Sequence, residues 1–145
     1  GWMFLAVVID LYSRAVVGWA MDSKSTQQLV SEALEMAVLS REPQSGLLLH
    51  SDQGSQYTSH AYLKQAKAYG MVLSMSRRGN CQDNAVAESF FHSLKIEWVR
   101  NRIYKNIEEA KQSIFKYIEM FYNRQRLHST NGYKSPFVYE ALNVA

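Results

Sequence analysis

The sequence predicts an α/β fold with a mixed β-sheet, on three observations. Short β-branched runs and longer segments with helical period follow one another in the order β-β-α-β-α-β-α-α, before a short terminal helix. The first two runs are joined by a turn and predict an antiparallel hairpin, whereas helical segments separate the later runs, as in parallel sheets. With 145 residues, 47% of them hydrophobic, the chain can form one globular domain, which we expect to span residues 1–145.

The hairpin is predicted at the N-terminus. Residues Phe4–Ile9 and Ala15–Met21 read as strands, and Asp10–Arg14 read as the turn between them. The continuous hydrophobicity of the first run predicts a strand that is covered on both faces. Asp10 could be a metal ligand, but at a strand end an aspartate more commonly forms the turn, so we favour the turn.

The first helix is predicted from Ser25 to about Ser40. Ser25 as N-cap and Gln28 three residues later have the spacing of a capping box, and Glu42–Gly46 end the helix. Apolar residues recur with helical period at Val30, Ala33, Leu34, Ala37 and Val38.

A strand over Leu47–His50 places Asp52 just beyond its carboxyl end. Ligand-binding crevices gather at such ends in open α/β sheets, although Asp52 taken alone is more commonly a turn residue. A helix over Ser59–Tyr69, ended by Gly70, and a strand over Met71–Met75 follow.

A glycine-bearing turn then opens into a helix, with Asp83 or Asn84 as its N-cap. The residues expected on its buried stripe are Ala87, Phe91, Leu94 and Trp98. Those expected to share the adjacent face are Glu88, His92 and Lys95. This face belongs either to an ordinary solvated helix or to the wall of a cleft.

Two more helices complete the chain. Asn106 caps the first, with Glu109 at the third helical position, and Ser135 precedes Pro136 at the start of the second. The basic segment Tyr122–His128 connects them. The predicted buried stripe of the first consists of Ile107, Ala110, Ile114, Tyr117, Ile118 and Phe121.

Composition narrows the possible partners. The net charge of +3 permits a nucleic-acid partner without demanding one. The single cysteine, Cys81, cannot form an internal disulfide and suits a reducing cytoplasm. No apolar run has the length of a membrane span, so we expect no membrane partner.

The two carboxylates Asp52 and Glu88 are separated by 35 residues. One follows a strand and the other begins a helix, so both can converge at one end of the sheet. Carboxylates placed in this way suit two Mg²⁺ ions, because hard cations take oxygen ligands. Such ions can activate an attacking hydroxyl and stabilise the leaving oxygen in phosphoryl transfer.

Several ordered motifs resemble one family. They are Leu5 to Arg14, His50 to Tyr57, Asp83 to Phe91, Leu94-Lys95, and Tyr122-Asn123 followed by Arg126-Leu127-His128. With the 35-residue spacing, they make the chain similar to the integrase-like catalytic core of IS3-type insertion-sequence transposases. That family is of the D-D-E class, has a ribonuclease-H-like fold and is related to retroviral integrases. The likeness covers essentially the whole chain.

The resemblance implies a function and a site. It implies metal-dependent DNA cleavage and strand transfer with two Mg²⁺ or Mn²⁺ ions, in which Asp52 and Glu88 are catalytic metal ligands. It implies DNA partners, both element ends and target, a homo-oligomer when complete, and action in the bacterial cytoplasm on nucleoid DNA. Lys95 matches a lysine that approaches DNA, with a solvated helix lysine as the alternative. Further candidate phosphate contacts, each individually more commonly just exposed, are Arg77, Arg78, Arg124, Arg126 and His128.

The chain departs from the family pattern at its start. The first catalytic Asp of the family lies on a strand upstream of the position of Trp2. We therefore expect an N-terminally truncated core that lacks its central first strand, is inactive alone and binds Mg²⁺ weakly. Its sheet would then have a gap, a direct pairing of Phe4–Ile9 with Leu47–His50, or a borrowed strand. If the chain is active instead, Asp10 is the first candidate for the residue that completes the metal site.

Two other functions remain open from the sequence. One is a truncated element product that inhibits by binding DNA or the full-length enzyme. A weaker one is a Mg²⁺-dependent nuclease of the same fold.

Overall fold

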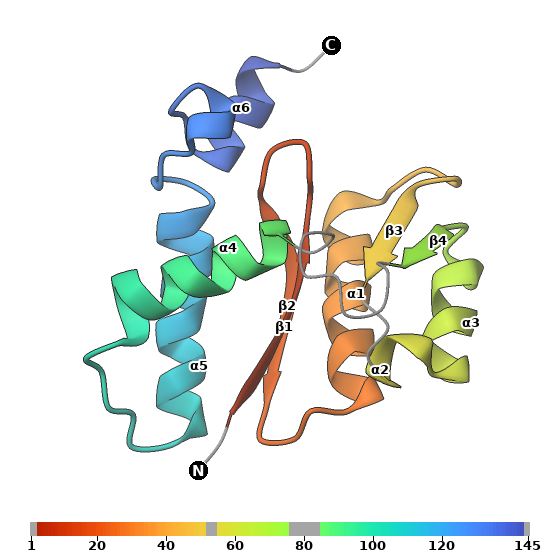
Figure 1. The fold of residues 1–145 in the computed structure, drawn as a ribbon, viewed down its shortest axis with the longest axis horizontal. Coiled ribbons are helices and arrows are strands. Elements are labelled where there is room, and N and C mark those ends of the chain that lie inside the picture. Colours follow the sequence, from red (N-terminus) through yellow and green to blue (C-terminus); the bar gives the residue numbers. More distant parts are fainter. Residues whose placement is uncertain (1–2, 52–54, 76–84, 144–145) are drawn as a thin grey trace. The chain divides into compact units, whose positions relative to one another are not determined.

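The computed structural model describes residues 3–51, 55–75 and 85–143. The chain groups into two compact units, one formed by residues 1–8 with 17–88 and the other by residues 9–16 with 89–145. Helix α4 belongs to both, since it begins in the first unit and continues in the second. Figure 1 shows the elements in chain order.

The first unit contains the predicted hairpin strands. β1 (Phe4–Ile9) and β2 (Val16–Asp22) form a two-stranded sheet. The expectation that both faces of β1 are covered is wrong, because only Ala6 is fully buried and Phe4 is 38% exposed. Within the described residues β1 pairs with β2 alone, so much of this apolar strand is only half-buried.

Helix α1 (Gln27–Arg41) has its N-cap one residue later than predicted. Its N-cap is Thr26, whose side chain accepts a hydrogen bond from the N–H of Leu29 at 3.4 Å. The hydroxyl of Ser25, the predicted cap, instead accepts from the side-chain amide of Gln56 at 2.7 Å. The backbone of Thr26 is extended, with φ −123° and ψ 167°, as an N-cap requires. The helix ends at Glu42, which has the left-handed conformation.

Strand β2 and helix α1 approach each other closely at Gly18. A Cβ atom at this position would lie 2.1 Å from the carbonyl oxygen of Ala33 and 2.8 Å from the Cβ of Ala37. Both alanines are buried. A glycine on the strand and small residues on the helix therefore allow two backbones to pack in direct contact.

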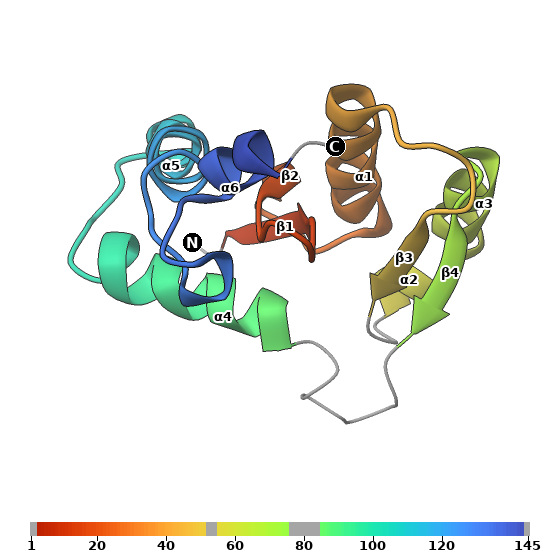
Figure 2. The same cartoon turned by 90° about the horizontal axis from the view of Figure 1, so that it is seen from above.

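The second sheet pairs β3 (Leu48–Ser51) with β4 (Val72–Met75) in parallel, with Leu48 opposite Val72. The predicted helix between them is α3 (His60–Ala68), capped by Ser59 and followed by Gly70 at φ +76°. A short helix that was not predicted, α2 (Ser55–Thr58), precedes it. Figures 1 and 2 show this β-α-β arrangement from two sides. The core of the unit consists of Ala6, Leu29, Val30, Ala33, Leu34, Tyr62, Ala66 and Met71.

The mixed α/β class is confirmed, but the strands of the described residues do not form one continuous sheet. β1–β2 and β3–β4 are separate two-stranded sheets. Of the three arrangements expected, direct pairing of β1 with β3 is therefore not formed, and within the described chain the two strand pairs remain unjoined.

The second unit is helical. α4 (Ala85–Leu94) continues into the π-helical segment η2 (Lys95–Val99), and α5 (Ile107–Phe115) continues into the π-helical segment η3 (Lys116–Tyr122). A 3₁₀ turn, η4 (Ser129–Asn131), leads to α6 (Pro136–Leu142).

Both predicted caps in this unit are confirmed. Asn106 accepts from the N–H of Glu109 at 2.8 Å, and Ser135 accepts from the N–H of Val138 at 3.4 Å. No helix in the described residues combines the length and the apolar character that a membrane span requires.

The buried stripe of α4 follows the prediction at Leu94 but not one turn earlier. Phe90 is completely buried, whereas Phe91, which was predicted to be buried, is only half-buried. Phe90 packs edge-to-face against Tyr122 at 5.0 Å between ring centroids and lies 6.3 Å from the ring of Tyr117. Because these aromatic partners lie beside Phe90, the helix turns that residue inward.

The hairpin turn belongs to the second unit. The carboxylate of Asp10 accepts from the N–H of Tyr12 at 2.9 Å, and Arg14 has a left-handed backbone at φ 69°. The turn role predicted for Asp10 is confirmed. The C-terminal segment also holds this turn, since the side-chain amide of Asn131 donates to the carbonyl of Ser13 at 2.7 Å.

Candidate functional site

Glu88 lies in the first turn of α4 and is exposed. His92 and Lys95, predicted on the same face, are exposed as well. The helix therefore presents a carboxylate, an imidazole and an ammonium group to solvent, while Phe90 and Leu94 face inward. A carboxylate at a helix N-terminus also interacts favourably with the helix dipole.

Other predicted site residues lie outside the described residues. They are Asp52, Arg77 and Arg78, together with the predicted caps Asp83 and Asn84. A bridging pair of metal ions implies that the Asp52 and Glu88 carboxylates approach to within about 6 Å. This approach therefore stays a prediction. Among the described residues, no group of three or more His, Cys, Asp or Glu side chains is placed to hold a metal ion.

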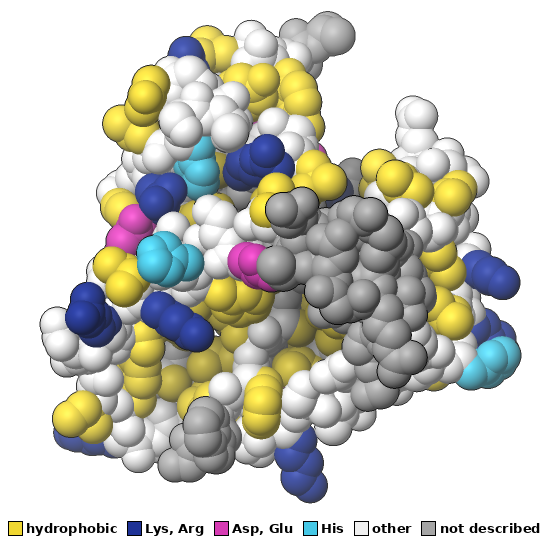
Figure 3. Space-filling model, viewed as in Figure 1, with side chains coloured by type: hydrophobic (Ala, Val, Ile, Leu, Met, Phe, Trp, Pro, Cys, Tyr) yellow, Lys and Arg dark blue, Asp and Glu magenta, His cyan; other side chains and the backbone are white. Residues whose placement is uncertain are grey.

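Basic side chains and histidines gather on one face of the second unit. Figure 3 shows them over α4 and over the segment that leads to α6. Of the predicted DNA contacts in these segments, Lys95 and Arg124 are exposed, whereas Arg126 and His128 are half-buried. The guanidinium of Arg124 lies 5.0 Å from the ring centre of Phe137, and its Nε donates to the carbonyl of Glu119 at 3.1 Å.

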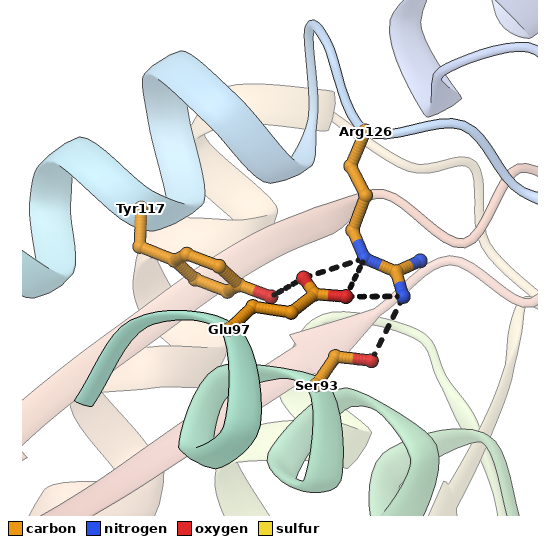
Figure 4. A network of polar contacts seen from close by, with 4 residues as sticks. All are labelled: Ser93, Glu97, Tyr117 and Arg126. Atoms are coloured by element: carbon orange, nitrogen blue, oxygen red, sulfur yellow. Dashed lines mark hydrogen bonds and ion pairs between the residues drawn. The ribbon is translucent and has the colours of Figure 1, made fainter. Parts of the chain in front are cut away.

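Arg126 is bound to Glu97 through two of its nitrogens. Nε lies 2.8 Å from Oε1 of Glu97, and Nη2 lies 2.8 Å from Oε2. Nη2 also donates to the hydroxyl of Ser93 at 3.1 Å, and the hydroxyl of Tyr117 donates to Oε1 at 3.0 Å. Figure 4 shows these four side chains together.

Opposite charge and hydrogen bonding shift the protonation equilibria of this network. The hydrogen bond from Arg126 holds the pKa of Glu97 below its usual value, and Glu97 raises the pKa of Arg126. Burial, followed by the hydrogen bond to Glu97, raises the pKa of Tyr117. At neutral pH the network therefore consists of a carboxylate, a guanidinium and a neutral phenol.

His128 is held in a half-buried position against Tyr122, with the two ring centroids 4.9 Å apart. Its Nε2 is a buried atom that forms no hydrogen bond among the described residues. Burial, reinforced by the charges of Arg126 and Arg14, lowers the pKa of His128 to about 4. The imidazole is therefore neutral at physiological pH, so a DNA contact by His128 would not be an ionic one.

Sequence reasoning missed two elements of this region. Glu97 was not singled out, although it lies four residues after Ser93 and therefore on the same side of the helix. Asn123 was recognised only as part of a motif, yet it is completely buried. A buried polar side chain leaves no periodic signal in a sequence, because its partners are set by the tertiary fold.

Comparison with known proteins places these features in a family. Two family models described as "Integrase core domain" match residues 1–81 and 88–143. The transposase InsF for insertion sequence IS3A of Escherichia coli (strain K12) is 46% identical over 145 residues, which are 100% of this chain and 50% of that protein. A transposase for element IS904 of Lactococcus lactis subsp. lactis (strain IL1403) is 46% identical over 143 residues, 99% of this chain and 56% of that protein. The chain thus spans about half the length of these curated relatives.

Solved structures share the fold. The catalytic core domain of BIV integrase superposes with a TM-score of 0.67 at 20% identity, covering 97% of this chain and 87% of that one. A chain in the structure of the simian T-cell lymphotropic virus intasome in complex with PP2A regulatory subunit B56 gamma gives a TM-score of 0.73 at 14% identity, with 97% of this chain and 48% of that chain covered. The HTLV-2 integrase catalytic core domain in complex with magnesium, in a dimeric form, gives a TM-score of 0.55 at 16% identity. The match covers 92% of this chain and 80% of that chain.

These likenesses agree with the ribonuclease-H-like α/β class predicted from the sequence. The family models together account for both the strand-bearing residues and the helical C-terminal half. The chain belongs to the integrase core domain family and is similar to the transposases of IS3-type insertion sequences.

Proposed function

We propose that this chain is the catalytic core of a DNA transposase, which cleaves DNA and joins DNA strands by metal-dependent phosphoryl transfer. The observation that carries the proposal is the position of Glu88. It is exposed in the first turn of α4, and it lies 35 residues after the other candidate carboxylate, Asp52, in a chain of the integrase core family. A fixed helix start is a suitable support for a catalytic carboxylate, because rigid elements hold reactive groups in place.

Asp52 and Glu88 would hold the metal ions. Their carboxylate oxygens are the ligand type that Mg²⁺ and Mn²⁺ prefer, so the donor set fits a divalent metal site. When bound, such ions activate the attacking hydroxyl and stabilise the leaving oxygen of the phosphodiester. The exposure of Glu88 leaves its carboxylate accessible to a metal and a DNA strand.

Basic side chains would bind the DNA backbone. Lys95 is exposed two helical turns after Glu88, so its ammonium can reach a phosphate that flanks the reacting one. Arg124, Arg77 and Arg78 are further candidates for contacts that do not depend on DNA sequence. We propose that the element ends and the target DNA are the substrates, and that copies of the protein assemble on them in the bacterial cytoplasm.

A strand-transfer assay tests the proposal. The protein, expressed as its gene encodes it, is incubated with labelled DNA duplexes that carry the ends of its element, in Mg²⁺ or Mn²⁺. We expect joined products with the wild-type protein. The variants Glu88→Gln and Asp52→Asn should lower the rate by about a thousandfold or more, because several kcal/mol of charge stabilisation is lost.

The matched control is Glu35→Gln, which removes an exposed carboxylate from α1. It should retain wild-type activity. An active Glu88→Gln variant, or a wild-type protein that joins no strands on its own element ends, would contradict the proposal.

A further inference from the structure

The helix that carries Glu88 and Lys95 is anchored on its other side by two polar residues. Ser93 and Glu97 lie four residues apart on α4 and η2, so they occupy the same side of the helix in successive turns. Ser93 is buried, at 8% exposure, whereas Glu88 and Lys95 are exposed. One residue, Arg126, binds both Ser93 and Glu97.

The contacts of Arg126 form a fork. Its Nε and Nη2 contact both carboxylate oxygens of Glu97 at 2.8–3.0 Å, and Nη2 also reaches Ser93 at 3.1 Å. A bidentate arginine–carboxylate pair fixes the relative direction of the two side chains as well as their distance. Arg126 thereby restrains both the rotation and the translation of two successive helical turns.

Tyr117 supports Glu97 from a third direction. It lies on η3, is completely buried and donates from its hydroxyl to Oε1 of Glu97 at 3.0 Å. Both carboxylate oxygens are thus engaged, by partners from η3 and from the segment that follows it (Figure 4). The side chains of Arg126 and Glu97 are only 24% and 34% exposed, so solvent screens the pair incompletely.

We infer that Glu97 and Arg126 are positioning residues for the proposed strand-transfer reaction. They hold α4 and η2 in one orientation against η3, and so fix the places of the Glu88 carboxylate and the Lys95 ammonium. Arg126 then acts through Glu97 and not through the DNA phosphate contact for which the sequence made it a candidate. This inference rests on the proposed function, because it assigns the network to the same reaction.

The expected effect is on the chemical step. Displacing a catalytic group by about 1 Å can cost about a hundredfold in rate, even when the altered residue never touches the substrate. Removing one partner of the fork should therefore slow strand transfer while the protein remains folded. DNA affinity should persist, because the phosphate contacts proposed for Lys95 and Arg124 remain.

The experiment compares Glu97→Gln, Arg126→Gln and the double variant with the wild-type protein, expressed as its gene encodes it. Glu108→Gln, at an exposed carboxylate on α5, is the matched control for loss of one negative charge. The rate of a single turnover at saturating DNA is measured together with the DNA dissociation constant at several salt concentrations. All assays run well below the unfolding midpoint of the least stable variant, so that lost stability does not mimic lost rate.

We expect each single variant to lower the single-turnover rate about tenfold or more, with a wild-type salt slope for DNA binding. The double variant should lose no more than the worse single variant, because both changes break one interaction. Arg126→Lys keeps the charge but not the fork, so it should bind DNA normally and still react slowly.

Three results would overturn the inference. The first is a weaker DNA affinity and a flatter salt slope in Arg126→Gln, with tighter binding in Glu97→Gln, which would make Arg126 a phosphate contact. The second is that Glu97→Gln and Arg126→Gln both fold and react at the wild-type single-turnover rate, a result that would not contradict the proposed function itself. The third is a wild-type protein without strand transfer, which would remove the proposed function as well. If the Gln variants fail to fold, Glu97→Asp and Arg126→Lys are judged by the same criteria.

Discussion

The side chain of Asn123 forms two hydrogen bonds with the backbone of Val16, which is 107 residues earlier in the chain. Its Nδ2 donates to the carbonyl of Val16 at 2.9 Å, and its Oδ1 accepts from the N–H of the same residue at 2.9 Å. Both residues are buried. The amide thus satisfies the two backbone groups at the start of β2 as a neighbouring strand would.

Replacing Asn123 with alanine should destabilise the protein. The change leaves the buried N–H and C=O of Val16 without partners, and we expect a loss of about 2–4 kcal/mol in the free energy of unfolding. Chemical denaturation measures this loss. Asn101→Ala, at an exposed asparagine, is the control and should change stability by less than about 0.5 kcal/mol. Equal effects of the two variants would show that the Asn123 amide contributes little.

Gly18→Ala should be poorly tolerated for a different reason. The new methyl group would overlap the carbonyl oxygen of Ala33, a backbone atom that can move only if α1 shifts. We expect a loss of about 3 kcal/mol or more, at or above the upper end of typical overpacking costs. Thermal and chemical unfolding measure it.

A comparison variant separates overpacking from backbone strain. Gly46→Ala places a methyl group where no heavy atom lies within 4 Å, although φ is +97° there. It should cost only the conformational penalty, about 1–2 kcal/mol. The double variant Gly18→Ala with Ala37→Gly should recover little of the loss, because it leaves the overlaps with the carbonyl oxygen of Ala33 and the backbone nitrogen of Ala37.

Acid should weaken the second unit through His128. Burial and the nearby charges of Arg126 and Arg14 lower its pKa to about 4, whereas an unfolded histidine has a pKa near 6.5. Between these two values the unfolded chain binds more protons than the folded protein, so stability falls as the pH falls from about 6.5 to about 4. Because His128 is only half-buried, we expect a loss of about 1–2 kcal/mol once solvent screening is allowed for.

Denaturant titrations across this pH range measure the effect. His128→Gln should flatten the pH dependence between about 4 and 6.5, whereas His60→Gln, at an exposed histidine on α3, should leave it unchanged. The lowered pKa of Glu97 acts in a lower window, since its contribution is present above the ordinary glutamate pKa and is lost as the pH falls through the lowered one. A His128→Gln variant that keeps the wild-type slope would contradict the assignment.

Lys95→Ala should weaken DNA binding without changing sequence preference. If the ammonium neutralises one phosphate, the slope of log affinity against log salt concentration should flatten by about one. Lys116→Ala, at an exposed lysine on η3, provides the comparison for loss of a positive charge. An unchanged salt slope in Lys95→Ala would mean that Lys95 is an ordinary solvated lysine.

Most elements of the fold could be predicted because their signals are local. Asn106 and Ser135 cap their helices as expected, because a cap depends only on residues within one turn. Gly70 follows α3 with a positive φ for the same reason. The exposed face of Glu88 and Lys95 also followed from helical period.

By itself, the sequence determined the order of the strands and helices except the short α2, the mixed α/β class and the family resemblance, since period, caps and motif spacing are written along the chain. The tertiary structure alone decided which of two adjacent residues faces inward or caps a helix, as at Phe90 and Thr26. It also decided that Arg126 binds Glu97 and that Asn123 binds Val16. Such choices depend on groups that lie far away in sequence, and a buried polar group takes whichever partner the packed fold brings within hydrogen-bond distance.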